Sequence, residues 1–514
     1  MVDQIEVVTF TTPAAPGTLD ITHPGITEPF SAAILIFTKE TADDTDGTHA
    51  VLGYGVIGIE GTDEEEACLS VQMRDGEASV PDANTVHSAA TAPDCVRVPD
   101  GSNAAVTVIA AQYSASIAGG VRINFSTTTV QAKCTAILFA GSARVAVGAV
   151  AASTIGAAES VGSAGNEFRP DLLVFLPSDG GTNSNTVDAT MALGFVLDQP
   201  GTPQISAFSN VDDGTEPTDA DAAIDSTRGY VILGPARARQ FVSIAITATG
   251  FTATSTVGTP DAAYLAIKWA DSARVHVGVA NMAVAASTGV QAFNSFGFTP
   301  DVVFGMATLL TSLDTLVDGP TAAVSGLFAF GRGGYQRAYA VRYDEGLTVP
   351  ADGTTHATSR QGDHALLMMD DTGTVVQQAS YLGASGSGGF LLNFSTASAA
   401  GYMTALGIQI IPSPPLPARR QRALRRSRAL LRRHPAPPVQ KAAASQPLPP
   451  SRLLALVARA RRAMRRRLRW KPPRVETATA TVGAAADEAK GMVASPGLAR
   501  GRVFGPGVPA DELP

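Results

Sequence analysis

Short apolar runs, separated by turns rich in Gly, Asp, Asn and Thr, follow one another along residues 1–411. In Arg144-Val-Ala-Val and Arg274-Val-His-Val, alternate positions are apolar, which is typical of a strand with one buried face. This alternation places His276 on the outward face. Helical periodicity is poor throughout the region, so the pattern predicts an all-β fold of antiparallel, sandwich-like sheets.

One apolar run recurs along the chain. Phe168-Arg-Pro-Asp-Leu-Leu-Val-Phe175 and Phe298-Thr-Pro-Asp-Val-Val-Phe304 open two similar blocks, and Phe30-Ser-Ala-Ala-Ile-Leu-Ile-Phe37 is a weaker copy without Pro-Asp. Proline fixes φ and biases the preceding residue toward extended structure, and the β-branched and aromatic residues that follow suit a buried strand. Each run is therefore predicted to be a strand behind a turn, at spacings of 138 and 130 residues that fit one compact domain per copy.

Other elements recur in the same order within each copy. A glycine-flanked apolar strand follows the opening strand, and a Gly-Gly or Thr-Gly turn precedes a Thr/Ser-rich strand, beginning at Gly119, Thr249 and Gly388. The junctions match as well, since Ser142-Ala-Arg-Val is answered by Ser272-Ala-Arg-Val. We predict three tandem antiparallel β-sandwich-like repeats, with boundaries at 1–141, 142–271 and 272–411.

The pattern changes after Ile411, where the proline-rich PSPPLP predicts a linker. An extended Arg/Pro-rich arm is predicted at 412–474, with two short helices near 418–433 and 451–470. The second helix has Ser451 as a candidate N-cap and an apolar stripe along one face. The tail at 475–514 is rich in Ala, Gly and Pro and is predicted to be flexible.

The net charge of −8 conceals a division between body and arm. Residues 412–474 contain 19 Arg and Lys and no Asp or Glu, while the rest of the chain holds 19 basic and 46 acidic residues. Arginine side chains of this arm are the candidate partner-binding residues, namely Arg425, Arg426, Arg432, Arg433, Arg461, Arg462, Arg465, Arg466 and Arg467.

Three kinds of partner fit such an arm. The arginines could dock on an acidic protein surface, neutralise the phosphates of nucleic acid, or rest as an amphipathic helix on anionic lipid. Trp470 is the one aromatic residue of the segment, so a nucleic acid would be held through its backbone rather than through stacked bases. We rank protein docking first, nucleic acid second and lipid third.

Motifs that resemble catalytic or cofactor sites fail on their context. Gly53-Tyr-Gly-Val-Ile-Gly58 matches a dinucleotide fingerprint, but no helix is predicted to begin there, so a strand is preferred. Gly383-Ala-Ser-Gly-Ser-Gly-Gly389 does not fit a nucleophile elbow and is interpreted as a flexible turn. The seven histidines show no metal-ligand spacing. We expect no cofactor, no metal site and no enzymatic activity.

Acidic clusters occur at Asp43-Asp44-Thr-Asp46, Asp212-Asp213 and Asp370-Asp371, and none has the EF-hand spacing. They are predicted to be solvated loops. The widely spaced Cys68, Cys95 and Cys134 favour small buried side chains over a zinc site or a disulfide framework. The acidic N-terminal residues and the lack of a long apolar run predict neither a signal peptide nor a membrane span.

The aromatic-x-Pro-Asp openings, the Gly-aromatic strands and the Gly-Gly-Phe and Phe-Ser-Thr strands resemble repeats of bacteriophage and prophage virion proteins, particularly tail-fibre and minor tail proteins. The best stretches are Gly297-Phe-Thr-Pro-Asp-Val-Val-Phe304 and Gly388-Gly-Phe-Leu-Leu-Asn-Phe-Ser395. The resemblance implies a virion protein whose partners are other virion proteins, further copies of the chain, and a host surface receptor or glycan.

The expected function is therefore structural. The three β units would form a rigid rod or a surface platform that takes part in host attachment, and the basic arm would anchor it to other virion proteins. A head-decorating or connector protein is an alternative of the same class. A tail-borne carbohydrate-binding or depolymerase module is an alternative of another class, and a depolymerase needs paired carboxylates at a defined separation.

Overall fold

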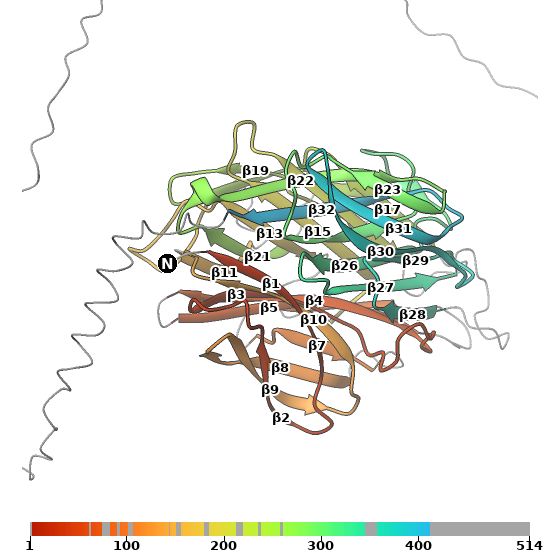
Figure 1. Ribbon diagram of the computed structural model, residues 1–514, viewed down its shortest axis with the longest axis horizontal. Coiled ribbons are helices and arrows are strands. Elements are labelled where there is room, and N and C mark those ends of the chain that lie inside the picture. The colour runs from red at the N-terminus through yellow and green to blue at the C-terminus, as the bar shows by residue number, and fades with distance from the viewer. Residues whose placement is uncertain are drawn as a thin grey trace, which may run out of the picture. The chain divides into compact units, whose positions relative to one another are not determined.

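Antiparallel strands dominate the computed structural model of the chain (Figure 1). The structure describes residues 3–60, 63–74, 83–89, 93–100, 106–142, 144–150, 156–178, 185–211, 219–234, 238–257, 261–344 and 357–411. Within these residues the one helical element is the short 3-10 turn η3 (Ser272–Arg274). The predicted all-β, antiparallel fold class is confirmed.

The first part of the chain forms two facing sheets, named pair A here. The larger sheet has the strand order β1-β10-β3-β4-β5-β6, and the smaller sheet has the order β2-β9-β8-β7. In Figure 1 the smaller sheet lies below the larger one. The strands are β1 (Gln4–Thr11), β2 (Gly17–Thr22), β3 (Phe30–Phe37), β4 (Ala50–Glu60), β5 (Asp63–Met73), β6 (Ala83–Ser88), β7 (Val96–Pro99), β8 (Thr107–Ile117), β9 (Gly120–Thr128) and β10 (Lys133–Ala140).

Pair B follows with the orders β11-β21-β13-β15-β16-β17 and β12-β20-β19-β18. Its strands are β11 (Arg144–Val150), β12 (Ala158–Ser160), β13 (Leu172–Ser178), β15 (Ala189–Leu197), β16 (Gln204–Val211), β17 (Ala220–Asp225), β18 (Tyr230–Gly234), β19 (Ala238–Ile246), β20 (Gly250–Val257) and β21 (Asp261–Lys268). Strand for strand, these orders repeat those of pair A.

Pair C has the orders β22-β32-β24-β26-β27-β28 and β23-β31-β30-β29, which again match pair A. Its strands are β22 (Val275–Val284), β23 (Gly289–Phe293), β24 (Val302–Thr308), β26 (Val324–Gly331), β27 (Gln336–Tyr343), β28 (Ala357–Gly362), β29 (Leu366–Met369), β30 (Val375–Ser385), β31 (Gly389–Ala397) and β32 (Gly401–Ile410).

Each pair has an apolar core between its larger and its smaller sheet. Cys68, Cys95 and Cys134 lie in the core of pair A, where all three are free and buried, as predicted. The opposite faces of the three larger sheets meet in one further core, to which Ile34, Val174 and Phe304 contribute from pairs A, B and C. The pairs therefore surround a common centre and are not strung end to end as in a rod.

Burial on both faces explains the apolar runs that open each copy. Every residue of β3, β13 and β24 is buried, so these strands read as continuous apolar stretches rather than as an alternation of polar and apolar positions. Phe168 and Phe298 lie ahead of β13 and β24, whereas Phe30 is the first residue of β3. The three aromatic residues thus do not share one structural position.

The Pro-Asp turn ties each opening strand to the end of the closing strand beside it. In pair B, Asp171 Oδ2 accepts a hydrogen bond from the Trp269 N–H at 2.8 Å. In pair C, Asp301 Oδ2 accepts one from the Ile410 N–H at 2.8 Å. The motif therefore positions the turn in the fold.

Segments exchanged between pairs cover one edge of each larger sheet. β14 (Asn185–Val187), from the loop after β13, pairs with β6 of pair A, and β25 (Val317–Asp318), from the loop after β24, pairs with β17 of pair B. In the loop after β3, the Gly47 N–H donates to the Ser359 carbonyl of β28 at 2.9 Å, and His49 bridges to Thr358. These exchanges run from A to C, from B to A and from C to B, so they close a ring within one chain. Covered edges cannot recruit strands from other molecules.

Glycines at the start of β9, β20 and β31 allow the strand beside them to approach closely. A Cβ added at any of them would lie about 2 Å from a backbone carbonyl oxygen of β2, β12 or β23; the distances are 2.1 Å at Gly120, 2.0 Å at Gly250 and 1.9 Å at Gly389. The preceding Gly119 and Gly388 have a φ of +86°, which favours glycine. This close packing is the reason for the recurring glycine turn.

A side-chain hydrogen bond joins the two sheets of each pair at a matching place. An acceptor on β5, β16 or β27 receives the backbone N–H of a residue on β8, β19 or β30. The acceptor and donor residues are Glu66 with Tyr113 at 2.7 Å, Gln204 with Ile244 at 2.9 Å, and Gln336 with Tyr381 at 2.7 Å.

Residues 412–514, which include the predicted arm, its helices near 418–433 and 451–470 and the tail at 475–514, lie outside the described residues. Their proposed structure and the repeat boundaries stay predictions.

Candidate functional site

The partner-binding residues predicted from the sequence all lie in the arm. Arg425, Arg426, Arg432, Arg433, Arg461, Arg462, Arg465, Arg466 and Arg467 are outside the described residues, so their role also stays a prediction.

The loop between β3 and β4 carries the first acidic cluster, and its carboxylates pair with basic side chains. Asp44 lies 2.8 Å from His364 Nε2, and Asp46 accepts from Arg360 Nη1 at 3.0 Å. Asp43 pairs with Lys133 and with Arg337. The expectation of a freely solvated loop is therefore wrong here, because three of these four partners belong to pair C and the loop fastens pair A to it.

Asp43 is the best-buried carboxylate of the cluster. Burial acts to raise its pKa, but hydrogen bonds and charge attraction from Lys133 and Arg337 outweigh burial and hold the pKa below its ordinary value. The Arg337 side chain is only 6% exposed, so its charge needs this partner.

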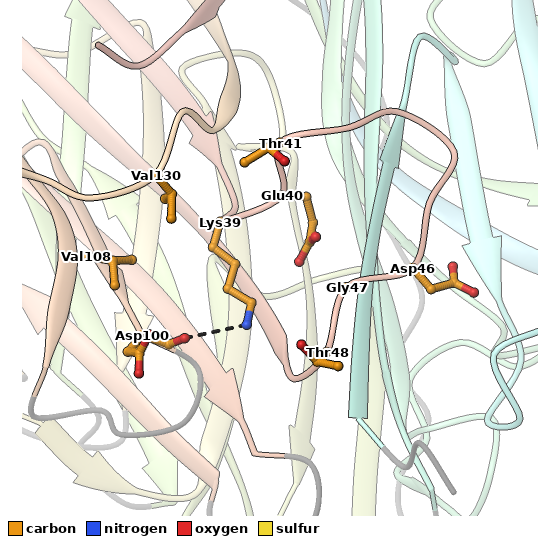
Figure 2. Close-up of a pocket in the computed structure, with 9 residues that line it drawn as sticks. All are labelled: Lys39, Glu40, Thr41, Asp46, Gly47, Thr48, Asp100, Val108 and Val130. Carbon is orange, nitrogen blue, oxygen red and sulfur yellow. Dashed lines mark hydrogen bonds between the residues drawn. The ribbon is translucent and has the colours of Figure 1, made fainter. Parts of the chain in front are cut away.

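A pocket of about 420 Å³ lies beside the same loop (Figure 2). The Lys39 side chain runs across it toward Asp100, with Val108 and Val130 on one side and Glu40 on the other. The residues that line it are Lys39, Glu40, Thr41, Asp46, Gly47, Thr48, Asp100, Val108 and Val130.

The two charged side chains at the centre of this pocket are held by the protein itself. Lys39 Nζ lies 3.5 Å from the carbonyl oxygen of Asp100, and burial lowers the pKa of Lys39. Burial also raises the pKa of Glu40, whose Oε1 accepts from Ser359 Oγ of pair C at 2.5 Å. Perturbed groups of this kind occur at functional sites and in structural networks alike. Because Glu40 bonds to the strand that the loop crosses, the geometry favours a structural role.

A second pocket of about 600 Å³ opens at one end of pair C. It is formed by the turn before β24, the turn between β26 and β27, the end of β30 and the end of β32. The residues that line it are Thr299, Arg332, Gly334, Tyr381, Leu382, Gly383, Ala384 and Gln409. Its one signal in the sequence was an exposed Tyr-Leu pair next to the glycine-rich turn, and sequence reasoning did not single it out.

The glycine motifs of the sequence are structural. Gly53 to Gly58 lie inside β4, which continues to Glu60, so no helix begins there to receive a phosphate and the strand interpretation is confirmed. A Cβ at Gly55 would lie 1.9 Å from the carbonyl oxygen of Cys95. The glycine-rich stretch that begins at Gly383 forms the turn between β30 and β31, as predicted.

The remaining candidate residues fall in different surroundings. His276 is exposed, as predicted, and its Nδ1 lies 3.2 Å from Gln409 Oε1. Asp370 accepts from the Thr374 N–H at 2.8 Å and so closes a turn, while residues 212–218 are outside the described part of the chain. Among the described residues, no group of three or more His, Cys, Asp or Glu side chains is placed to hold a metal ion. In the same residues, no helix has the length and apolar character needed to cross a membrane.

No protein-family model matches the chain, and no curated protein matches it. Function has to be argued from the residues themselves.

Proposed function

We propose that the protein is a structural, non-enzymatic component of a phage virion, associated with the tail in the manner of a tail-fibre or minor tail protein. Three tandem β-sandwich repeats would form a projecting platform, and the basic arm would anchor it to other virion proteins. The arm's nine listed arginines are the proposed contact residues.

The observation that carries this proposal is the ring closed by the loops after β3, β13 and β24. A protein exposed on a particle has to resist unfolding and association with its neighbours. The shared core buries one face of each larger sheet, and the exchanged segments β14 and β25 cover strand edges that would otherwise pair with other chains. The identical strand orders of pairs A, B and C support their reading as repeats.

Charge supports the assignment of the arm as an anchor. The arm is purely basic, whereas the rest of the chain holds 46 acidic and 19 basic residues. Long-range attraction would therefore bring the arm to an acidic surface before close contacts form, while the acidic body stays in solution. A head-decorating or connector protein would use the same architecture, and nucleic acid stays an alternative partner of the arm.

The test follows the protein into purified particles. A chain that lacks residues 412–514 should keep the melting temperature of the body and be absent from particles, as measured by quantitative mass spectrometry. Replacing the nine arginines with lysine should preserve incorporation and replacing them with glutamine should abolish it, because attraction depends on charge.

Gold-labelled antibody against the body should mark the tail, whereas labelling of the head would favour the head-decorating alternative. Particles that contain none of the full-length protein would overturn the proposal.

A further inference from the structure

The pocket at the end of pair C has features of a ligand site that the virion role does not require. We propose that it binds a neutral saccharide of two or three sugar rings, held by Tyr381, Arg332 and Gln409. This inference goes beyond the proposed function and does not depend on where the protein is located.

A β-bulge shapes one wall of the pocket. The register between β30 and β31 shifts between Tyr381 and Gly383, so Leu382 has no partner opposite it and its side chain is 54% exposed. Tyr381 is held at both ends of its backbone and ring: its N–H donates to Gln336 Oε1 at 2.7 Å, and its ring centroid lies 5.0 Å from that of Phe330. An apolar and aromatic wall of this kind suits the C–H face of a sugar ring.

Planar polar side chains on the opposite walls are already oriented. Arg332 Nη1 donates to Asp301 Oδ1 at 3.1 Å, which leaves other guanidinium donors for a ligand. Gln409 Oε1 lies 3.2 Å from His276 Nδ1, so its amide is fixed in place. Side chains that are held before binding lose little entropy on binding, and hydroxyl groups of a sugar can both donate to and accept from them.

Space and charge narrow the class of ligand. A volume of 600 Å³ falls within the range of about 300 to 1,000 Å³ typical of small-molecule sites. Backbone positions in two walls are open, since a Cβ at Gly334 or Gly383 would meet nothing within 4 Å. Asp301 balances the charge of Arg332, so the pocket offers an anion no net positive charge, and a neutral ligand fits it better.

Pair A provides a matched control. Its bulge falls at the same place, between Tyr113 and Ala115, but Ser114 stands where pair C has Leu382. Ser116 of pair A pairs with Val121 as Ala384 of pair C pairs with Phe390. Ser116→Trp therefore adds the same bulk as Ala384→Trp at the corresponding place of another sheet.

The full-length chain would be titrated with maltose, cellobiose, lactose and N,N′-diacetylchitobiose by saturation-transfer NMR and calorimetry. At least one disaccharide should bind. Ala384→Trp should abolish that binding, Arg332→Ala and Gln409→Ala should each weaken it about tenfold or more, and Ser116→Trp should leave it unchanged, with melting temperatures checked for every variant.

Failure of all four disaccharides to bind would overturn the inference, and so would binding that survives Ala384→Trp. Preference for a glucuronate-containing disaccharide over its neutral analogue would overturn the assignment to a neutral ligand. None of these results bears on whether the protein is found in particles.

Discussion

The hydroxyl of Tyr54, in pair A, lies 3.1 Å from the backbone carbonyl oxygen of Phe175, in pair B. The same hydroxyl reaches the carbonyl of Ala192, and the Tyr54 ring lies 6.4 Å from the ring of Phe304 in pair C. One fully buried side chain thus contacts all three pairs at the centre of the shared core. The stability of each pair depends on the other two.

Tyr54→Phe tests this dependence. The change keeps the ring but removes the hydroxyl, so buried carbonyl groups lose a donor, and we expect a loss of about 1–3 kcal/mol in the free energy of unfolding. Denaturant titration measures it. Tyr113→Phe is the control, because the Tyr113 hydroxyl bonds to Ser116 Oγ at the surface and its loss should cost little. Equal costs for the two variants would contradict the central role of Tyr54.

The repeated glycines give a second prediction. Gly120→Ala, Gly250→Ala and Gly389→Ala would each press a methyl group against a backbone carbonyl that cannot move aside, at a cost of about 3 kcal/mol or more. Gly386→Ala is the matched control from the turn before β31, where an added Cβ meets nothing within 4 Å. Thermal melts should separate the three damaging variants from the control, and similar melting temperatures for all four would refute the packing argument.

His87 predicts a loss of stability in mild acid. The residue lies on β6, neither ring nitrogen has a hydrogen-bond partner among the described residues, and burial lowers the pKa of His87 to about 4. In the unfolded chain the pKa is about 6.5, so between these values the unfolded state binds a proton that the folded state does not. Stability is therefore complete above about pH 6.5 and falls as the pH drops toward 4, by about 3 kcal/mol in all.

His87→Leu should flatten this dependence between pH 6.5 and 4, whereas His276→Gln, at an exposed position, should leave it unchanged. The measurement is the free energy of unfolding at several pH values. An unaltered slope in His87→Leu would show that other groups control the acid response.

Glu40 predicts the opposite sign. Burial raises its pKa, so the folded state favours the protonated carboxyl, and the stability that protonation provides is lost as the pH rises through the folded pKa. Glu40→Gln resembles the protonated form and still offers Oε1 to Ser359. We expect this variant to melt higher than the natural chain at pH 7.5 and equally at pH 4, and a lower melting temperature at pH 7.5 would show that the carboxylate charge is needed, for example by Lys39.

Local pattern predicted the elements of this fold well. The strands at Leu172–Ser178 and Val302–Thr308, the burial of Cys68 and the exposure of His276 all follow from residue type and alternation over a few positions. The glycine turns were found as repetition, but the reason for them, a carbonyl about 2 Å from an added Cβ, depends on a strand about a hundred residues away.

The candidate sites were harder to predict because their residues come from distant parts of the chain. Asp43 was expected in a solvated loop, yet Arg337 pairs with it across 294 positions. The pocket of pair C joins Thr299, Arg332, Tyr381 and Gln409 from four different segments. No short spacing brings such residues together, so the sequence carried no motif for them.

By itself the sequence determined the all-β class, the opening strands, the buried cysteines and the contrast between an acidic body and a basic arm, because strand pattern, turn chemistry and charge are properties of neighbouring residues. Only the tertiary structure decided that the three sheet pairs surround one core and that each loop after an opening strand covers a neighbour's edge. The physical reason is that burial on both faces of a sheet and pairing at its edge depend on which surfaces meet, and that is settled by long-range packing.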